Sequence, residues 1–305
     1  MLAEVCGSSA FFGYGKGGSS KAMATIPGYV KELRRKTPVP ERRSTDADRL
    51  SPIAALVQRH DRDRFQTVLF APAARREALF ALYAFNYEIA RVRETVTQPM
   101  LGQIRLQWWR ENIAAAFECG AIRRHPVVEA LAAVIGEFRL TRDHFDRLID
   151  AREIDLADEP PAGLAALEDY AEATSARLVY LALEVLGVHD SAADEAGLHV
   201  GIAYSLAGLL RAISFRARPI IPPDIPTRTG VAELTEAALR HLEAARVRRD
   251  RIPRSALPAL LPAVVARRSL ARLKRTGYDP FDPDLLTPDP LQSWRLAAAA
   301  LFNRF

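Results

Sequence analysis

Apolar residues recur at helical spacing along most of this chain. In the segment ALYAFNYEIARV (81–92), Leu82, Phe85, Ile89 and Val92 are separated by three or four positions, so they share one stripe of a helix. Almost no segment shows the strict alternation of apolar and polar residues that is typical of a β-strand. The pattern predicts an all-α fold, with helices at residues 51–60, 72–94, 99–119, 126–138, 141–157, 164–187, 190–215, 231–250, 254–275 and 290–303.

Residues that start and stop helices agree with these positions. Pro72 and Pro126 suit the first turn of a helix, where the missing amide hydrogen costs nothing. Thr141 followed by Asp143 favours a helix start, and Gly187 favours a helix end. These signals support a helical bundle.

The N-terminal stretch differs from the rest of the chain. Residues 1–50 are basic and interrupted by proline, which predicts a flexible tail ahead of a single helical domain at residues 51–305. The first 22 residues, rich in glycine and serine, resemble neither a secretory signal nor a good mitochondrial presequence. Met1 and Met23 are both candidate start residues.

Composition and charge limit the function classes. The chain has 305 residues with 49% hydrophobic content, enough for a large core, and a net charge of +5. Arginines are spread over most helices, often near Glu or Asp, which argues against a nucleic-acid-binding patch. The basic excess also suits an anionic membrane surface. No run of eighteen apolar residues occurs, so no membrane-spanning helix is expected.

Few residues suggest metal or acid–base chemistry. Cys6 and Cys119 share no metal-binding spacing, which fits a reducing compartment, and the histidines show no ligand spacing either. The carboxylates of LIDAREIDLADE (148–159), including Asp150, Glu153, Asp155 and Asp158, alternate with arginines and are expected to form a solvated helix face. We therefore predict no metal site and assign no catalytic residue.

Several segments occur in an order that is informative. They are RREALFALYAF (75–85), IRLQWWRE (104–111), HPVVEAL (125–131), FDRLIDAREIDL (145–156), LEDYAEATSARLVYLALEVLG (167–187), GIAYSLAGLLRAISFRARPIIPPD (201–224) and LPALLPAVVARRSLARL (257–273). Their order resembles the squalene and phytoene synthase family of trans-prenyltransferases. The resemblance implies an isoprenoid synthase fold, isoprenyl diphosphate substrates and Mg²⁺ held by aspartates one helical turn apart.

The aspartates that this resemblance leads one to expect are absent. The family's first aspartate motif falls on Ala90, Arg91 and Glu94, so one carboxylate of three remains. The second motif falls on Ser205, Gly208, Ala212 and Arg216, with the family arginine kept as Arg211. An arginine in place of an aspartate repels a cation, so the metal clamp cannot be assembled from these residues.

A more specific resemblance is to the degenerate branch of the family that is typified by complex I assembly factor 6. The shared patterns are AFN-x-E-x-A-x-V (84–92), R-x-Q-W-W (105–109), YAE-x-T (170–174), L-x-YL-x-LE-x-LG (178–187) and QSWR (292–295). The resemblance implies a non-catalytic role in building NADH:ubiquinone oxidoreductase. The partner would be a complex I subunit or an assembly intermediate. The place of action would be the cytoplasm, with peripheral contact to the inner membrane, or the mitochondrial matrix in a eukaryote.

Two functions from different classes stay open at this point. In the first, the protein is a pseudoenzyme that acts through protein contacts and needs no cofactor, and Trp108, Trp109 and Trp294 are candidate partner-binding residues. In the second, it is a weakened prenyltransferase that uses Glu94 and Mg²⁺.

A ligand hypothesis accompanies the first. An apolar tunnel would hold an isoprenoid or lipid chain, and Arg91, Arg211 or Arg216 would grip its phosphate. For the helix around residues 201–212, however, the small residues Gly201, Ser205 and Gly208 favour close packing of neighbouring helices.

Overall fold

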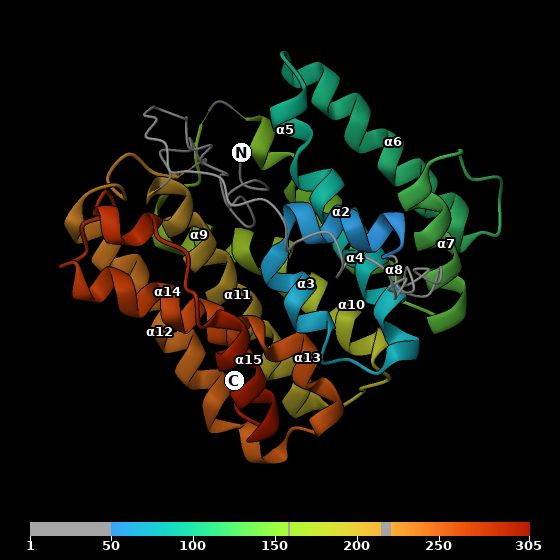
Figure 1. Ribbon diagram of the computed structural model, residues 1–305. Helices are drawn as coiled ribbons and strands as arrows, with labels where there is room; N and C mark the ends of the chain where they lie inside the picture. Colours follow the sequence, from blue (N-terminus) through green and yellow to red (C-terminus); the bar gives the residue numbers. More distant parts are fainter. Residues whose placement is uncertain (1–49, 158, 215–220) are drawn as a thin grey trace, which may run out of the picture.

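The computed structural model describes residues 50–157, 159–214 and 221–305. Within these residues every regular element is a helix, which confirms the predicted all-α fold. The helices pack around α4 (Ala73–Ala90) and α11 (Ser191–Ser214), which lie near the middle of the bundle (Figure 1). The expected tail up to residue 49, together with Cys6, Asp158 and Arg216, lies outside the described residues.

The other helices follow the predicted order closely. They are α2 (Pro52–His60), α3 (Arg62–Val68), α5 (Val92–Thr95), α6 (Pro99–Phe117), α7 (Pro126–Phe138), α8 (Arg142–Ala151), α9 (Gly163–Ala171), α10 (Arg177–Val185), α12 (Arg228–Val247), α13 (Leu257–Leu260), α14 (Pro262–Arg275) and α15 (Gln292–Leu301). Single turns occur at η2 (Ile154–Leu156), η3 (Glu172–Ala176), η4 (Arg249–Arg251), η5 (Arg254–Ala256) and η6 (Pro283–Leu286).

Helix α3 was not among the predicted elements. It spans seven residues, too few for a helical period to show in the sequence. Its start is fixed by Asp61, whose side chain accepts a hydrogen bond from the Arg64 amide at 3.1 Å. This short helix matters because it carries Asp63 and Arg64, together with its N-cap Asp61, into the interior of the molecule.

The helix predicted at residues 72–94 is interrupted. Helix α4 ends at Ala90, Arg91 forms the junction and α5 begins at Val92. The predicted apolar stripe is nevertheless confirmed, because Phe85 and Val92 are both buried, as are the stripe residues between and before them. The interruption turns the residues after Ala90 away from the axis of α4.

Small residues on α11 serve two different purposes. Gly201 lies against η3, where an added Cβ would come within 2.4 Å of the Ala176 Cα, so the packing interpretation is confirmed there. It is wrong for Gly208, where an added Cβ would meet no described atom within 4 Å. Gly208 and half-buried Ser205 instead leave space inside the bundle.

Helix α11 bears on the expectation that no helix spans a membrane. Residues Ser191–Ile213 are long and apolar enough to cross a membrane by length and composition, although no uninterrupted apolar run reveals this in the sequence. In the structure 72% of the apolar window is buried among the other helices. This burial is typical of the central helix of a bundle.

Candidate functional site

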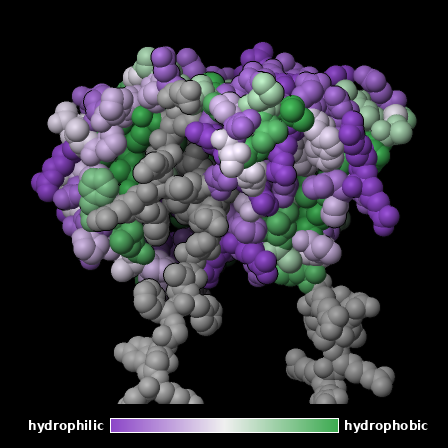
Figure 2. Space-filling model, turned by 90° about the horizontal axis from the view of Figure 1, so that it is seen from above, coloured by the Kyte–Doolittle hydropathy of each residue, from purple (hydrophilic) through white to green (hydrophobic). Residues whose placement is uncertain are grey.

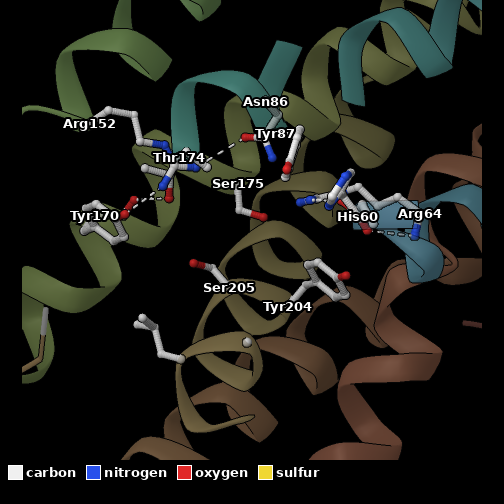
Figure 3. A pocket seen from close by; sticks show the side chains of 14 residues that line it. His60, Arg64, Asn86, Tyr87, Arg152, Tyr170, Thr174, Ser175, Tyr204 and Ser205 are labelled. Carbon is white, nitrogen blue, oxygen red and sulfur yellow. Dashed lines mark hydrogen bonds and ion pairs between the residues drawn. The ribbon is translucent and has the colours of Figure 1, made fainter. Parts of the chain in front are cut away.

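A central cavity lies between the helices that correspond to the two aspartate motifs. Its volume is about 90 Å³, below the roughly 300–1,000 Å³ that is typical of small-molecule pockets. Most of the side chains that line it are polar (Figure 3). They are His60, Asp61, Arg64, Asn86, Tyr87, Arg152, Tyr170, Thr174, Ser175, Tyr204 and Ser205, with Ala90, Gly208 and Leu209 completing the wall.

A widened helical turn shapes one wall of the central cavity. Between α9 and α10 the turn η3 is a π-helix, a rare form that often marks functional sites. The Thr174 hydroxyl donates to the Tyr170 carbonyl at 2.7 Å. Ser175 is buried and its hydroxyl finds no hydrogen-bond partner among the described residues. In Figure 3, Ser175 and Ser205 extend from opposite walls into the same space.

The first degraded motif reaches the cavity with one residue only. Ala90 lines the cavity, whereas Arg91 and Glu94 lie beyond the end of α4. Arg91 is half-buried, donates to Glu88 at 3.5 Å and lies over the Tyr87 ring at 5.2 Å. Glu94 is exposed on α5 and is not among the described residues that line the cavity.

The second degraded motif contributes space instead of charge. Ser205 and Gly208 line the cavity, and Ala212 is fully buried one turn further along α11. The structure therefore brings Ala90, Ser205 and Gly208 to the wall of one cavity. Arg216 lies outside the described residues.

The arginine retained in the second motif has a different partner. Arg211 donates to Asp63 of α3 at 2.7 Å. The other carboxylate oxygen of Asp63 accepts from Gln292 of α15 at 2.8 Å, and Gln292 also donates to Gln66 at 2.8 Å. Gln292 opens the QSWR segment, so this segment ties the C-terminal helix α15 to α3 and, through Asp63, to Arg211 of α11.

A second arginine–aspartate pair, Arg152 and Asp155, lies beside the central cavity. Arg152 donates to the Tyr170 hydroxyl at 2.8 Å, to Asp155 at 3.3 Å and to Asn86 at 3.3 Å. The Tyr170 hydroxyl in turn donates to Asp155 at 2.7 Å. Burial raises the pKa of Tyr170 and keeps its hydroxyl protonated as this donor requires.

This pair corrects the expectation of a solvated carboxylate face. Asp155 and Arg152 are only 6% and 7% exposed, while Asp150 and Glu153 are exposed and bind Arg110 at the surface. A signal was present in the sequence, because Arg152 continues the apolar helical stripe of Phe145, Leu148 and Ile149.

A third arginine pair closes the other side of the cavity. Arg64 donates to Asp61 at 2.8 Å and lies over the Tyr204 ring at 4.8 Å and the Tyr83 ring at 5.6 Å. Burial raises the pKa of Tyr83 to about 12. Sequence reasoning missed Arg64, because its helix is too short to be recognised.

The arrangement does not suit Mg²⁺. Asp61 is the only carboxylate among the described residues that line the cavity, and Arg64 already neutralises it. No group of three or more His, Cys, Asp or Glu side chains in the described ranges could hold a metal ion. A hard cation needs several oxygen ligands, and these side chains do not supply them.

The expected phosphate grip is also not assembled in the described part of the chain. Arg211 is engaged by Asp63, and Arg91 is not among the residues that line the cavity. The arginines that do line it are Arg64 and Arg152, each paired with an aspartate. We therefore describe the interior as three arginine–aspartate pairs: Arg64–Asp61, Arg152–Asp155 and Arg211–Asp63.

The three tryptophans lie in different environments. Trp109 is 4% exposed and packs edge-on against Phe85 with ring centroids 5.4 Å apart, so it is a core residue and is not available to a partner. Trp108 is half-buried beside His125. Trp294 on α15 is 75% exposed, so Trp294 and Trp108 remain candidate partner-binding residues.

Comparison with known proteins places these observations in context. The family model for squalene/phytoene synthase matches residues 57–233. The chain is 32% identical to NADH dehydrogenase (ubiquinone) complex I, assembly factor 6 of Rattus norvegicus, over 79% of this chain and 80% of that protein. It is 27% identical to presqualene diphosphate synthase of Rhodopseudomonas palustris, over 62% of this chain and 74% of that protein.

The fold also matches a solved structure. Squalene synthase from Alicyclobacillus acidocaldarius superimposes with a TM-score of 0.66 at 20% identity, covering 75% of this chain and 94% of that one. This likeness supports the isoprenoid synthase fold. It carries no conclusion about activity, because the sequences have diverged so far.

Proposed function

Because this chain belongs to the squalene/phytoene synthase family, we propose that it is a non-catalytic member that acts in the assembly of respiratory complex I. One observation carries the proposal. The positions of the family's aspartate motifs carry Ala90, Arg91 and Glu94 in the first motif and Ser205, Gly208 and Ala212 in the second, and Ala90, Ser205 and Gly208 line one small cavity. The assembly factor 6 relatives suggest the alternative use of such a fold.

Electrostatics explain why chemistry is not the favoured function. Loss of a diphosphate leaving group needs cations or donors aimed at the developing negative charge. Arg64 and Arg152, which line the cavity, are held by Asp61 and Asp155. Their positive charge is largely cancelled within the chain, so little stabilisation remains for a departing diphosphate.

The proposed partner is a complex I subunit or an assembly intermediate. The proposed location follows the role: the cytoplasmic face of the inner membrane in a bacterium, or the matrix in a mitochondrion. Trp108 and Trp294 offer accessible aromatic area for protein contacts.

The test separates assembly from catalysis in the same cells. NADH:ubiquinone oxidoreductase activity is measured in cells that lack the protein, and then after complementation with the native chain or with Glu94→Gln. Assembly through protein contacts predicts that both restore activity equally, because Glu94 is exposed and plays no part in the cavity. Restoration by the native chain alone would show that the remaining carboxylate of the motif is needed.

A parallel assay addresses the chemistry directly. Purified protein is given farnesyl or geranylgeranyl diphosphate with and without Mg²⁺, and pyrophosphate release is followed. No turnover is expected. Mg²⁺-dependent release from the native chain would overturn the proposal and return the protein to the prenyltransferases. A variant that restores aspartate at positions 90, 91, 212 and 216 tests whether the motif losses alone explain inactivity.

A further inference from the structure

Helix α15 has two unlike faces. Leu296 is fully buried against the bundle. Trp294 and Leu301 are 75% and 69% exposed. They are seven positions apart, so they share one side of the helix, opposite Leu296. Leu291 and Phe302, just beyond the helix ends, are 51% and 66% exposed. Together, Leu291, Trp294, Leu301 and Phe302 form what we name the outer face of α15.

The helix is anchored in a way that leaves this face outward. Gln292 binds Asp63 and Gln66, and Ser293 accepts from Gln66 at 3.1 Å. These polar bonds fix the start of α15 on α3, while Leu296 fixes its middle. Figure 1 shows α15 on the outside of the bundle beside α14. Its orientation is therefore set by specific contacts.

Arginines accompany the outer face. Arg254, Arg295 and Arg304 are exposed, and the Arg254 guanidinium donates to the Leu301 carbonyl at 3.3 Å. Asp289, which lies just before α15, is only 9% exposed at its side chain and binds both Arg268 and Arg295, so this cluster has more positive than negative charge. The charge presented to solvent here is positive. In the view of Figure 2, hydrophilic residues make up much of the described surface, with apolar residues among them.

We propose that the outer face of α15 docks on an anionic phospholipid surface, with Trp294, Leu301 and Phe302 entering the headgroup region and Arg254, Arg295 and Arg304 meeting lipid phosphates. An apolar stripe with a tryptophan and flanking arginines is typical of helices that lie in a membrane interface. The positive edge is complementary to anionic headgroups.

The size of the face favours a bilayer over a protein. A stable protein interface covers about 800 Å² on each partner. Helix α15 has ten residues and one outward stripe, which is small for such an interface on its own. A bilayer demands no matching shape, and a few inserted side chains together with phosphate contacts suffice for reversible binding.

The inference deepens the membrane-side location within the proposed function, but its test needs no complex I subunit. The full chain is mixed with vesicles of phosphatidylcholine alone or with phosphatidylglycerol added, and bound protein is separated by sedimentation. Binding that requires the anionic lipid and weakens with salt is expected. Absence of binding to anionic vesicles at low salt would overturn the inference and leave the assembly role standing.

Variants locate the contact. Trp294→Ser, Leu301→Ser and Phe302→Ser combined should weaken vesicle binding about tenfold or more, because the inserted apolar area is lost. The matched control is Met100→Ser, Leu101→Ser and Ile104→Ser, which removes three exposed apolar residues from α6. Equal loss in both variants would show that no particular face binds lipid, and would refute the placement.

A second pair of variants tests the charge. Arg254→Gln, Arg295→Gln and Arg304→Gln combined should weaken binding to anionic vesicles by about tenfold to a hundredfold. Arg93→Gln, Arg124→Gln and Arg240→Gln remove the same charge from exposed sites elsewhere and should leave most of the binding intact. If neither α15 variant changes vesicle binding but the apolar one abolishes capture of a complex I subunit, the face binds protein and the lipid inference is wrong.

Discussion

The central cavity and the outer face of α15 differ in how their charged side chains are paired. Inside, Arg64, Arg152 and Arg211 are each neutralised by an aspartate of the same chain. Outside, apolar side chains are exposed beside Arg254, Arg295 and Arg304, and Arg295 shares the single carboxylate of Asp289 with Arg268. Buried ionic groups must be paired internally, whereas exposed ones remain available to a partner. The contrast agrees with the proposal that this chain acts through contacts at its surface.

The largest effect should come from opening the interior network. Arg152→Met removes the donor that Asp155 and Tyr170 share, which leaves a buried carboxylate without its cation. The free energy of unfolding in urea should fall by about 3–5 kcal/mol.

Arg110→Met is the surface counterpart of this change. Arg110 binds Asp150 and Glu153, whose side chains are 63% and 52% exposed, so a loss of about 1 kcal/mol or less is expected. Similar losses of unfolding free energy in Arg152→Met and Arg110→Met would mean that the buried pair stabilises the fold no more than an exposed pair does. The contrast between interior and surface would then fail.

An intermediate loss of stability is expected at Asp63, which joins the interior to α15. Asp63→Asn removes the charge that holds Arg211 and weakens the bond to Gln292. Unfolding free energy should fall by about 1.5–3 kcal/mol. Amide hydrogen exchange in α15 should accelerate more than exchange in α7, because the anchor of the C-terminal helix is loosened.

Asp143→Asn provides the control for this anchor. Asp143 pairs with Arg147 one turn away, and both side chains are 56% exposed. Its loss should change unfolding free energy by no more than about 0.5 kcal/mol. Unchanged exchange in α15 after Asp63→Asn would show that Leu296 alone holds the helix.

The same two regions show how far the sequence can predict this molecule. Helical periodicity predicts α7 at the observed residues and the burial of Phe85, because packing repeats with the helix turn. The positions of Ala90, Ser205 and Gly208 around one cavity agree with the family resemblance.

The polar interior could not be predicted in the same way. Asp155 pairs with Arg152 and Tyr170 through a turn and a separate helix, and charge composition alone favours a solvated face. The link from Asp63 to Gln292 joins residues 229 positions apart, and no local pattern encodes it. Exposure of Trp294 likewise depends on how α15 is anchored, not on its own sequence.

A smaller effect concerns a half-buried pair that belongs to neither region. His199 of α11 lies with its Nδ1 atom 2.9 Å from the Nδ1 atom of His241, which contacts Glu168 at 3.2 Å. Burial lowers the pKa of His199 below its ordinary value of 6.5, and His241 and Arg248 lower it further, against the opposing effect of Glu195.

Because the pKa of His199 is lowered in the folded chain, the free energy of unfolding should decrease as pH falls. The unfolded chain binds a proton at His199 more readily than the folded chain, so the stabilising contribution is complete above pH 6.5 and is lost as pH falls towards the folded pKa. Urea unfolding at a series of pH values should show this decline.

Matched variants assign the decline to one residue. His199→Gln should flatten the decline in stability. His189→Gln, at an exposed position just before the start of α11, should leave the decline unchanged. An unaltered pH profile in His199→Gln would place the titrating group elsewhere.

The smallest effect should come from the outer face itself. Trp294→Ala should change the free energy of unfolding by no more than about 0.5 kcal/mol, because an exposed side chain loses little on truncation. Trp109→Ala, the same substitution at a 4% exposed position, should cost about 3–5 kcal/mol by leaving a cavity beside Phe85. A large loss at Trp294 would mean that the residue supports the fold, and its exposure would no longer point to a partner. Near-zero loss leaves binding as the reason for a solvent-exposed tryptophan on an otherwise well-anchored helix.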